Sequence, residues 1–246
     1  PASISYIALT HIHLDHAGGA GFLMQHFPNA RVIIHSGDAQ HLTAPERLVA
    51  GTYETIGYDL TGEYGPVLPV PEERLYIVQG GESVSLGQRE LKAIHTPGHT
   101  PHHLCFYLPD ERGLFCGDAL GVYFPTVDIM CPGVAPPTFD LELTLETADQ
   151  LQSLDPAVLF FSHFGPGKTT RALNQRFQEM SKDIAGLILQ AISSGNILEQ
   201  LCQRLERYLL GNSATPPRLT PIMIQVWAQG YIGYFKKKGL IREVKE

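Results

Sequence analysis

Side chains that bind metals are concentrated in one short stretch near the start of the sequence. His11, His13, Asp15 and His16 all lie within six residues. Burying such groups without partners would cost roughly several kcal/mol for each group, and a divalent cation removes that cost. A histidine-rich loop exposed to water would avoid the cost as well, and the stretch taken alone leaves that alternative open. Imidazole and carboxylate at this density favour a transition-metal site, because they are its usual protein ligands.

The flanking residues predict that this stretch follows a buried strand. Residues 4–9 form a short apolar run rich in β-branched and aromatic side chains, which is typical of such a strand. The glycine-rich segment 17–21 allows a tight turn, and residues 22–27 resume at helical spacing. Residues 30–35 predict the next strand. The metal-binding stretch would therefore lie at a strand end inside a strand-helix-strand unit.

Three later motifs carry residues of the same types, each just past a predicted strand. They are His99 in Thr96–Thr100, Asp118 at the end of Phe115–Asp118, and His163 in Phe160–Pro166. Loops at strand ends are held by a rigid sheet, so side chains on them can converge. Taken alone, Asp118 could instead cap a helix, and His163 could be satisfied by backbone groups.

The four motifs in this order, spread over some 150 residues, resemble those of the metallo-β-lactamase superfamily. The resemblance implies an αββα sandwich of the α/β (α+β) class with a two-metal site at one edge. It implies one metal held by His11, His13 and His99, a second metal held by Asp15, His16 and His163, and Asp118 as the bridge between them. Zinc suits these donors best, and iron or manganese also suits them.

The same resemblance implies a metal-dependent hydrolase that cleaves an ester, thioester or lactone bond of a small molecule. The nucleophile would be a hydroxide between the metals, because bound cations lower the pKa of water from 15.7 to roughly 7. Asp15 would orient it, so Asp15 and Asp118 are the expected catalytic residues. True zinc β-lactamases have a cysteine where this chain has Asp118, which favours the glyoxalase II-like group. A single-iron persulfide dioxygenase and a non-catalytic metal-binding scaffold are the alternatives.

Other polar and aromatic residues are candidates for supporting roles. His102 and His103 follow the His99 loop and are expected to orient the ligands from an outer shell. Residues 45–71 interleave glycine, proline and tyrosine, which predicts either a substrate lid or a loop packed for structure alone. Tyr58, Tyr123 and Phe124 are the candidate substrate-binding residues, since pockets combine apolar surface with a few polar groups. The Tyr123 hydroxyl could also donate to a developing oxyanion.

The remaining pattern predicts strands followed by helices. Residues 75–78, 83–86 and 90–94 predict an antiparallel meander, 102–108 and 114–116 a hairpin, and 140–154 a helix. After residue 171 only helices are predicted: 171–192, 196–210 and 219–238. We therefore expect a metal-binding domain over residues 1–170 and a helical extension over 171–246. The extension could cover the sandwich, shape the pocket or form a homodimer.

Composition narrows the class of protein. The chain has 246 residues, 43% of them hydrophobic, and a net charge of −7, which gives no basic field for nucleic acid. No signal peptide and no apolar run of membrane-spanning length is recognisable, and the four cysteines lack Cys-x-x-Cys spacing, so we expect a cytoplasmic protein without a membrane partner. Members of the family usually carry several dozen strand-rich residues before the first motif. This chain could therefore lack its N-terminal strands, where no metal ligand is expected.

Overall fold

The chain folds into two compact units, and each is described by itself. The computed structural model describes residues 4–57, 64–194, 198–211 and 221–241. Unit 1 comprises Pro1–His95 and His102–Pro109, and unit 2 comprises Thr96–Pro101 and Asp110–Glu246. These units do not follow the expected division at residue 170, which stays a prediction.

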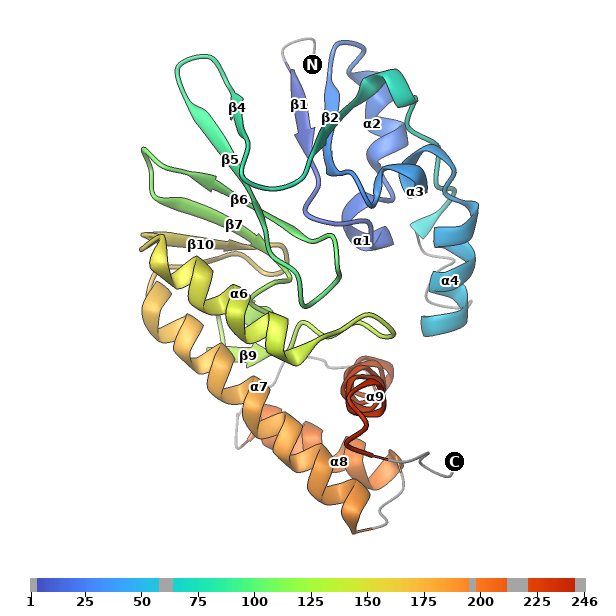
Figure 1. The fold of residues 1–246 in the computed structure, drawn as a ribbon, viewed down its shortest axis with the longest axis vertical. Helices are drawn as coiled ribbons and strands as arrows, with labels where there is room; N and C mark the ends of the chain where they lie inside the picture. Colours follow the sequence, from blue (N-terminus) through green and yellow to red (C-terminus); the bar gives the residue numbers. More distant parts are fainter. Residues whose placement is uncertain (1–3, 58–63, 195–197, 212–220, 242–246) are drawn as a thin grey trace. The chain divides into compact units, whose positions relative to one another are not determined.

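Unit 1 contains a parallel three-stranded sheet with helices beside it (Figure 1). Its strands, in spatial order, are β1 (Tyr6–Ala8), β2 (Arg31–His35) and β3 (Leu75–Val78). Its α-helices are α1 (Leu14–Ala17), α2 (Ala20–His26), α3 (Ala39–Thr43) and α4 (Glu46–Ile56). The predicted strand-helix-strand unit is confirmed by the parallel pairing of β1 with β2.

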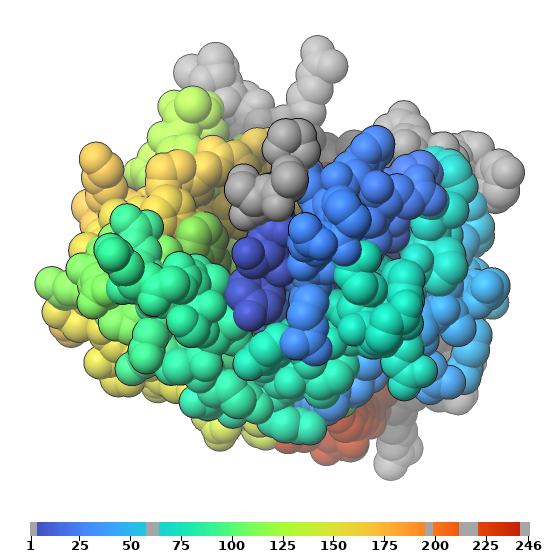
Figure 2. Space-filling view, turned by 90° about the horizontal axis from the view of Figure 1, so that it is seen from above, coloured from blue at the N-terminus to red at the C-terminus, as the bar shows by residue number. Residues whose placement is uncertain are grey.

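A second, antiparallel set of strands completes unit 1. It consists of β4 (Ser83–Ser85), β5 (Glu90–His95) and β6 (Leu104–Leu108). The prediction that residues 75–78 begin this meander is wrong, because β3 pairs in parallel with β2. The long connection that holds α3 and α4 lets the chain return in the same direction, as parallel pairing requires. Figure 2 shows the blue residues of β1 and β2 directly beside the teal residues of the β3 region.

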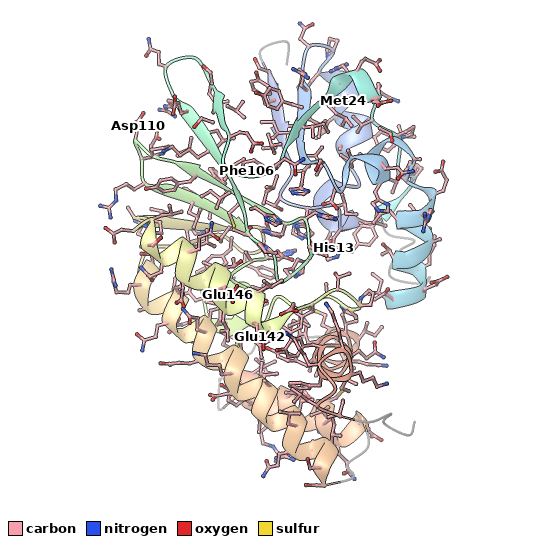
Figure 3. All side chains as sticks on the ribbon, viewed as in Figure 1. His13, Met24, Phe106, Asp110, Glu142 and Glu146 are labelled. Atoms are coloured by element: carbon pink, nitrogen blue, oxygen red, sulfur yellow. The ribbon has the colours of Figure 1, made fainter. Side chains whose placement is uncertain are left out.

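Alternate residues of β2 face two different parts of the core of unit 1. Val32 and Ile34 belong to one buried cluster with Met24 of α2 (Figure 3). Ile33 belongs to a second cluster with Phe106 of β6. Successive side chains on a strand point to opposite faces, so β2 lies between the helices and the antiparallel strands. This double coverage fixes the end of the neighbouring strand β1, from which the first motif follows.

Arg74 ties the long connection to the turn that precedes β2. It ends the short 3₁₀ helix η2 (Glu72–Arg74). Its Nε donates to the carbonyl oxygen of Ala30 at 2.7 Å, and its Nη2 donates to that of Phe27 at 2.7 Å. The half-buried guanidinium thereby binds two carbonyl groups of this turn, and that of Phe27 also accepts from the Ala30 backbone at 3.0 Å.

Replacing Arg74 by methionine should lower the free energy of unfolding by roughly 1–3 kcal/mol, because charged donors to buried carbonyls are worth about that much. Urea denaturation measures the change. Arg47→Met, at an exposed position of α4, is the control and should change little. Equal losses in the two variants would contradict an anchoring role for Arg74.

The described part of unit 2 contains a mixed sheet, a small hairpin and long helices (Figure 1). In the sheet, β10 (Val158–Phe161) lies between β7 (Gly113–Gly117), which is parallel to it, and β11 (Pro166–Gly167), which is antiparallel. The hairpin is formed by β8 (Val122–Phe124) and β9 (Ile129–Cys131). The helices are α6 (Leu141–Ser153), α7 (Thr170–Ser193), α8 (Leu198–Leu210) and α9 (Pro221–Lys237).

The three C-terminal helices match the predicted ranges to within a few residues, and their apolar faces are used inside unit 2. Tyr231 of α9 is fully buried and donates its hydroxyl hydrogen to the Ser181 carbonyl of α7 at 3.1 Å. Its ring meets that of Phe139 at a centroid distance of 4.9 Å. Ile222 of α9 is 39% exposed, and a homodimer stays a prediction. Within the described part of the chain, no helix is both long and apolar enough to cross a membrane.

Candidate metal centre

The first motif lies where β1 ends and α1 begins. The backbone of Leu9 still donates to Ile33 of β2 at 3.0 Å, and the Thr10 carbonyl accepts from Leu104 of β6 at 2.7 Å. The chain then turns into α1, with His13 at its N-cap position (Figure 3). Strands on both sides therefore hold the backbone that carries the histidines.

The histidine rings of this motif are packed against one another in unit 1. His11 is fully buried, and its Nε2 lies 2.9 Å from His13 Nδ1. Its ring centroid lies 4.2 Å from that of His16. Only one nitrogen of a close imidazole pair can donate, so such a cluster suits a cation that accepts lone pairs from several rings.

Asp15 adds a carboxylate at the edge of this cluster. Its Oδ2 lies 3.3 Å from His16 Nε2, and its side chain is 39% exposed whereas that of His16 is 8% exposed. Unit 1 thus brings together all four predicted donors of the first motif. The exposed side of Asp15 leaves an oxygen accessible to water.

In unit 2, α6 fixes the backbone of the loop that carries His99. Thr147 donates to the Pro97 carbonyl at 2.7 Å, and the Asp140 backbone donates to the Gly98 carbonyl at 2.9 Å. Gly98 has a φ of +135°, and a Cβ there would lie 2.5 Å from the Thr144 hydroxyl. The buried face of α6 includes Thr144 and Thr147.

Asp118 lies between two histidines of unit 2. Its Oδ2 is 3.6 Å from His99 Nε2, and its Oδ1 is 3.7 Å from His163 Nε2. Both distances are longer than hydrogen bonds. They suit a cation between each nitrogen and oxygen, because metal–nitrogen and metal–oxygen bonds of about 2.0–2.2 Å in tetrahedral geometry separate the two donors by roughly 3.4 Å. One carboxylate thus faces two separate nitrogen donors, one with each oxygen.

The backbone carbonyl group of Gly133 orients the His99 ring. The His99 ring is 5% exposed, and its Nδ1 lies 3.0 Å from the Gly133 carbonyl oxygen. A carbonyl oxygen only accepts, so Nδ1 carries the proton and Nε2 keeps its lone pair. This is the outer-shell arrangement common to metal-binding histidines.

The donor chemistry of the two units fits a divalent transition metal. Among the described residues, the His and Asp side chains that could hold a metal ion are the seven named from the sequence. Unit 1 contributes His11, His13, Asp15 and His16, and unit 2 contributes His99, Asp118 and His163. Imidazole and carboxylate donors of this kind are typical of zinc and also of iron and manganese sites.

The two predicted outer-shell histidines lie in different surroundings. His103 is fully buried, with its ring centroid 5.0 Å from that of His11, beside a predicted ligand. His102 instead stacks on His35 at 4.9 Å, and His35 stacks on His95 at 5.1 Å. This second group, the His35–His95–His102 stack, lies wholly in unit 1.

Two rings of the His35–His95–His102 stack, those of His35 and His102, resist protonation. Burial, followed by the charges of His102 and His95, lowers the pKa of His35. Burial, followed by the charges of His95 and His41, lowers that of His102. The folded state therefore favours the neutral forms of His35 and His102. This contribution to stability is present above the ordinary pKa of 6.5 and is lost as pH falls below it.

Asp38, at the start of α3, has the opposite pH dependence. It is 4% exposed, and burial raises its pKa from 3.8 to about 7. The folded state binds this proton more tightly than the unfolded state. The resulting stability is present below pH 3.8 and is lost as pH rises to about 7.

Asp38→Asn should therefore gain stability relative to the parent as pH rises from 4 to 8. The gain is at most about 4 kcal/mol, since the shift is about three pKa units at 1.36 kcal/mol each. Urea unfolding of both proteins at several pH values measures it, and the histidine contributions cancel in the difference. A difference that does not change with pH would show that Asp38 titrates normally.

The predicted substrate-binding residues are Tyr58, Tyr123 and Phe124. Tyr58 lies outside the described residues. The Tyr123 hydroxyl donates to Asp128 Oδ1 at 3.0 Å, and Arg176 of α7 donates to the same oxygen at 2.8 Å. Because a phenol has one hydrogen, a role for Tyr123 as oxyanion donor would require breaking this bond.

Phe124 stacks on Phe164, which the sequence analysis did not single out. Their ring centroids are 4.1 Å apart with an interplanar angle of 23°. Phe164 follows His163 directly in the last motif. This position next to a candidate ligand is the feature of the sequence that could have identified Phe164 as part of the site. Gly133 and Thr147 were missed as well. No spacing in the sequence links them to His99, because each acts through a backbone contact made by folding.

Gly133→Ala should weaken metal binding by about 10–100-fold, the usual loss when an outer-shell contact is disturbed. A Cβ at Gly133 would lie 2.3 Å from the Asp118 carbonyl oxygen, so Asp118 or the carbonyl that holds His99 must move. Competition with a fluorescent chelator measures the affinity. Gly186→Ala, on α7 with open space around it, is the control and should bind metal as the parent does. Parent-like affinity in Gly133→Ala would remove Gly133 from the site.

Comparisons with known proteins place the chain in a family. The metallo-beta-lactamase superfamily matches residues 1–163. A metallo-beta-lactamase fold-containing protein of Sulfurisphaera tokodaii, ST1585, is 33% identical over 165 residues, which are 66% of this chain and 61% of that protein. The acyl-coenzyme A thioesterase MBLAC2 of Gallus gallus is 34% identical over 119 residues, 45% of this chain and 40% of that protein. Other relatives include a lactonase and hydroxyacylglutathione hydrolases.

Solved structures share the fold. The crystal structure of ST1585 has a TM-score of 0.67 at 24% identity and covers 94% of this chain and 80% of that chain. The crystal structure of TTHA1429 from Thermus thermophilus has a TM-score of 0.69 at 20% identity. The match covers 97% of this chain and 76% of that chain. The chain has the metallo-β-lactamase fold with a C-terminal helical region, and it belongs to the metallo-β-lactamase superfamily.

Proposed function

We propose that this chain is a two-metal hydrolase that cleaves an ester, thioester or lactone bond of a small molecule. The observation that carries the proposal is Asp118, whose two oxygens face two different histidine nitrogens at 3.6 and 3.7 Å. A carboxylate that binds one cation through each oxygen is a bridging ligand. A single-metal site would leave one of these oxygens without a metal partner.

The assignment of ligands follows the family pattern. His11, His13 and His99 would hold one metal, Asp15, His16 and His163 would hold the other, and Asp118 would bridge them. When bound, the metals supply a hydroxide near neutral pH and polarise the carbonyl oxygen of the substrate. Zinc is the proposed metal, and iron or manganese would serve the same donors.

The protein's own residues position the reacting groups. Gly133 keeps the His99 ring in the tautomer that presents Nε2. Asp118 holds its carboxylate between His99 and His163, which fixes where the attacking oxygen lies. Asp15 has an exposed carboxylate next to His16, and it accepts a hydrogen bond from the attacking water and orients it toward the carbonyl carbon.

The relatives support hydrolysis of an acyl bond. The chicken relative is an acyl-coenzyme A thioesterase, and others are fungal carboxyl ACP thioesterases, a lactonase and hydroxyacylglutathione hydrolases. This chain spans 27 to 61% of the first of these relatives, so the activity of the whole protein is part of the proposal.

Metal analysis of the protein purified without chelator should find nearly two transition-metal ions per chain. Asp118→Asn should lose metal and reduce turnover of an acyl thioester by more than about 100-fold, because even outer-shell changes cost 10–100-fold. Asp110→Asn, at an exposed position of the same unit (Figure 3), is the matched control. Stoichiometry near one that added zinc, manganese or iron does not raise would refute the two-metal proposal.

Reaction under argon separates hydrolysis from sulfur oxidation. A hydrolase cleaves the thioester without oxygen, with water as the only other reactant. Oxygen uptake on glutathione persulfide, together with one iron per chain, would instead identify the dioxygenase alternative. Failure to bind any metal would leave the non-catalytic scaffold.

A further inference from the structure

The loop that carries His163 holds an exposed aromatic side chain in an uncommon backbone conformation. Phe164 is 62% exposed, the most exposed large hydrophobic residue among the described residues. Its φ is +65°, a left-handed value that non-glycine residues rarely adopt. Such conformations cluster at functional sites, where the surrounding structure holds them. The exposed side chain and the left-handed backbone conformation together indicate that Phe164 contacts another molecule.

The ring of Phe164 rests on a rigid support. Its partner Phe124 is 9% exposed and lies in β8. The hairpin of β8 and β9 is tied to α7 through Asp128, which binds both Tyr123 and Arg176. The Tyr123 ring also meets Phe161, the last residue of β10, at 5.6 Å. One face of Phe164 is thus fixed on the hairpin while most of its surface remains exposed.

Phe164 lies close to the candidate metal ligands of unit 2. Its ring centroid lies 6.1 Å from that of His163, and His163 faces Asp118. The Phe164 ring is therefore near enough to contact the acyl part of a substrate whose carbonyl is held beside His163. An acetyl group is too short to cover the ring, whereas a benzoyl or medium-chain acyl group reaches it.

We propose that Phe164, supported by Phe124, is a specificity-determining residue that binds the apolar aryl or extended acyl part of the substrate. The inference rests on the proposed hydrolase function and adds the class of acyl group that it accepts. Aromatic contacts of this kind favour offset stacking and exclude water from the neighbouring carbonyl. Acyl groups without an extended apolar part gain no binding energy from these aromatic contacts.

The kinetic test compares benzoyl and acetyl thioesters of N-acetylcysteamine. Phe164→Ala should lower kcat/KM for the benzoyl thioester about 10-fold, the factor that corresponds to one good aromatic contact, and change that for the acetyl thioester less than about 2-fold. Phe164→Tyr should keep the parent preference. Equal losses on both thioesters would overturn the proposal.

Two further variants separate side-chain contact from backbone effects. Phe164→Gly accepts a φ of +65° without strain, so it should match Phe164→Ala in preference if only the ring matters. Phe115→Ala removes the ring from another exposed aromatic stack in unit 2, in which Phe115 and Phe160 lie 4.8 Å apart. It should behave as the parent, and a matching loss of preference there would contradict the assignment.

A binding measurement keeps the inference testable if the parent cleaves neither thioester. Benzoate and acetate are titrated calorimetrically into the zinc-loaded protein. The parent should bind benzoate about 10-fold tighter than acetate, and Phe164→Ala should bind both equally. The same preference in parent and variant overturns the role of Phe164, whereas absent turnover with a preserved benzoate effect counts only against the hydrolase proposal. A shift of oligomeric state in Phe164→Ala, seen by sedimentation, would show that the ring contacts a second chain.

Discussion

A single carboxylate sets the organisation of unit 2. Asp118 places its two oxygens 3.6 and 3.7 Å from the Nε2 atoms of His99 and His163. Those distances are too long for hydrogen bonds and suit the coordination of a divalent metal. The remaining features of the site serve to hold that carboxylate and its two histidines at this spacing.

The backbone provides most of this control. Gly98 and Gly133 allow chain segments to approach within distances that a Cβ would block, and α6 binds the carbonyl groups of the His99 loop through Thr147 and the Asp140 backbone. Charged donors that must lie within a few ångströms of a cation require rigid support, because small displacements lose coordination. The close backbone contacts at the two glycines and the buried threonine side chains supply that support. They do so without adding side chains that compete for the metal.

The eleven histidines of the chain serve more than one purpose in unit 1. His11, His13 and His16 pack edge to face or tilted, and a nitrogen of His11 lies 2.9 Å from one of His13. The rings of the His35–His95–His102 stack lie nearly parallel, which favours contact between ring faces. The same residue type is therefore a candidate ligand in one cluster and a packing element in the other, and ring orientation distinguishes the two.

The sequence by itself determined the family, the order of the four motifs, the seven candidate ligands and the C-terminal helices, because ligand chemistry and helical periodicity are local properties. It did not determine that β3 leaves the meander to pair with β2, since strand partners depend on the long connection between them. Nor did it indicate that Asp128 engages the Tyr123 hydroxyl, that His102 stacks apart from the predicted ligands, or that Phe164 lies exposed on Phe124. These outcomes depend on residues far apart in the chain, and only tertiary packing brings such residues within contact distance.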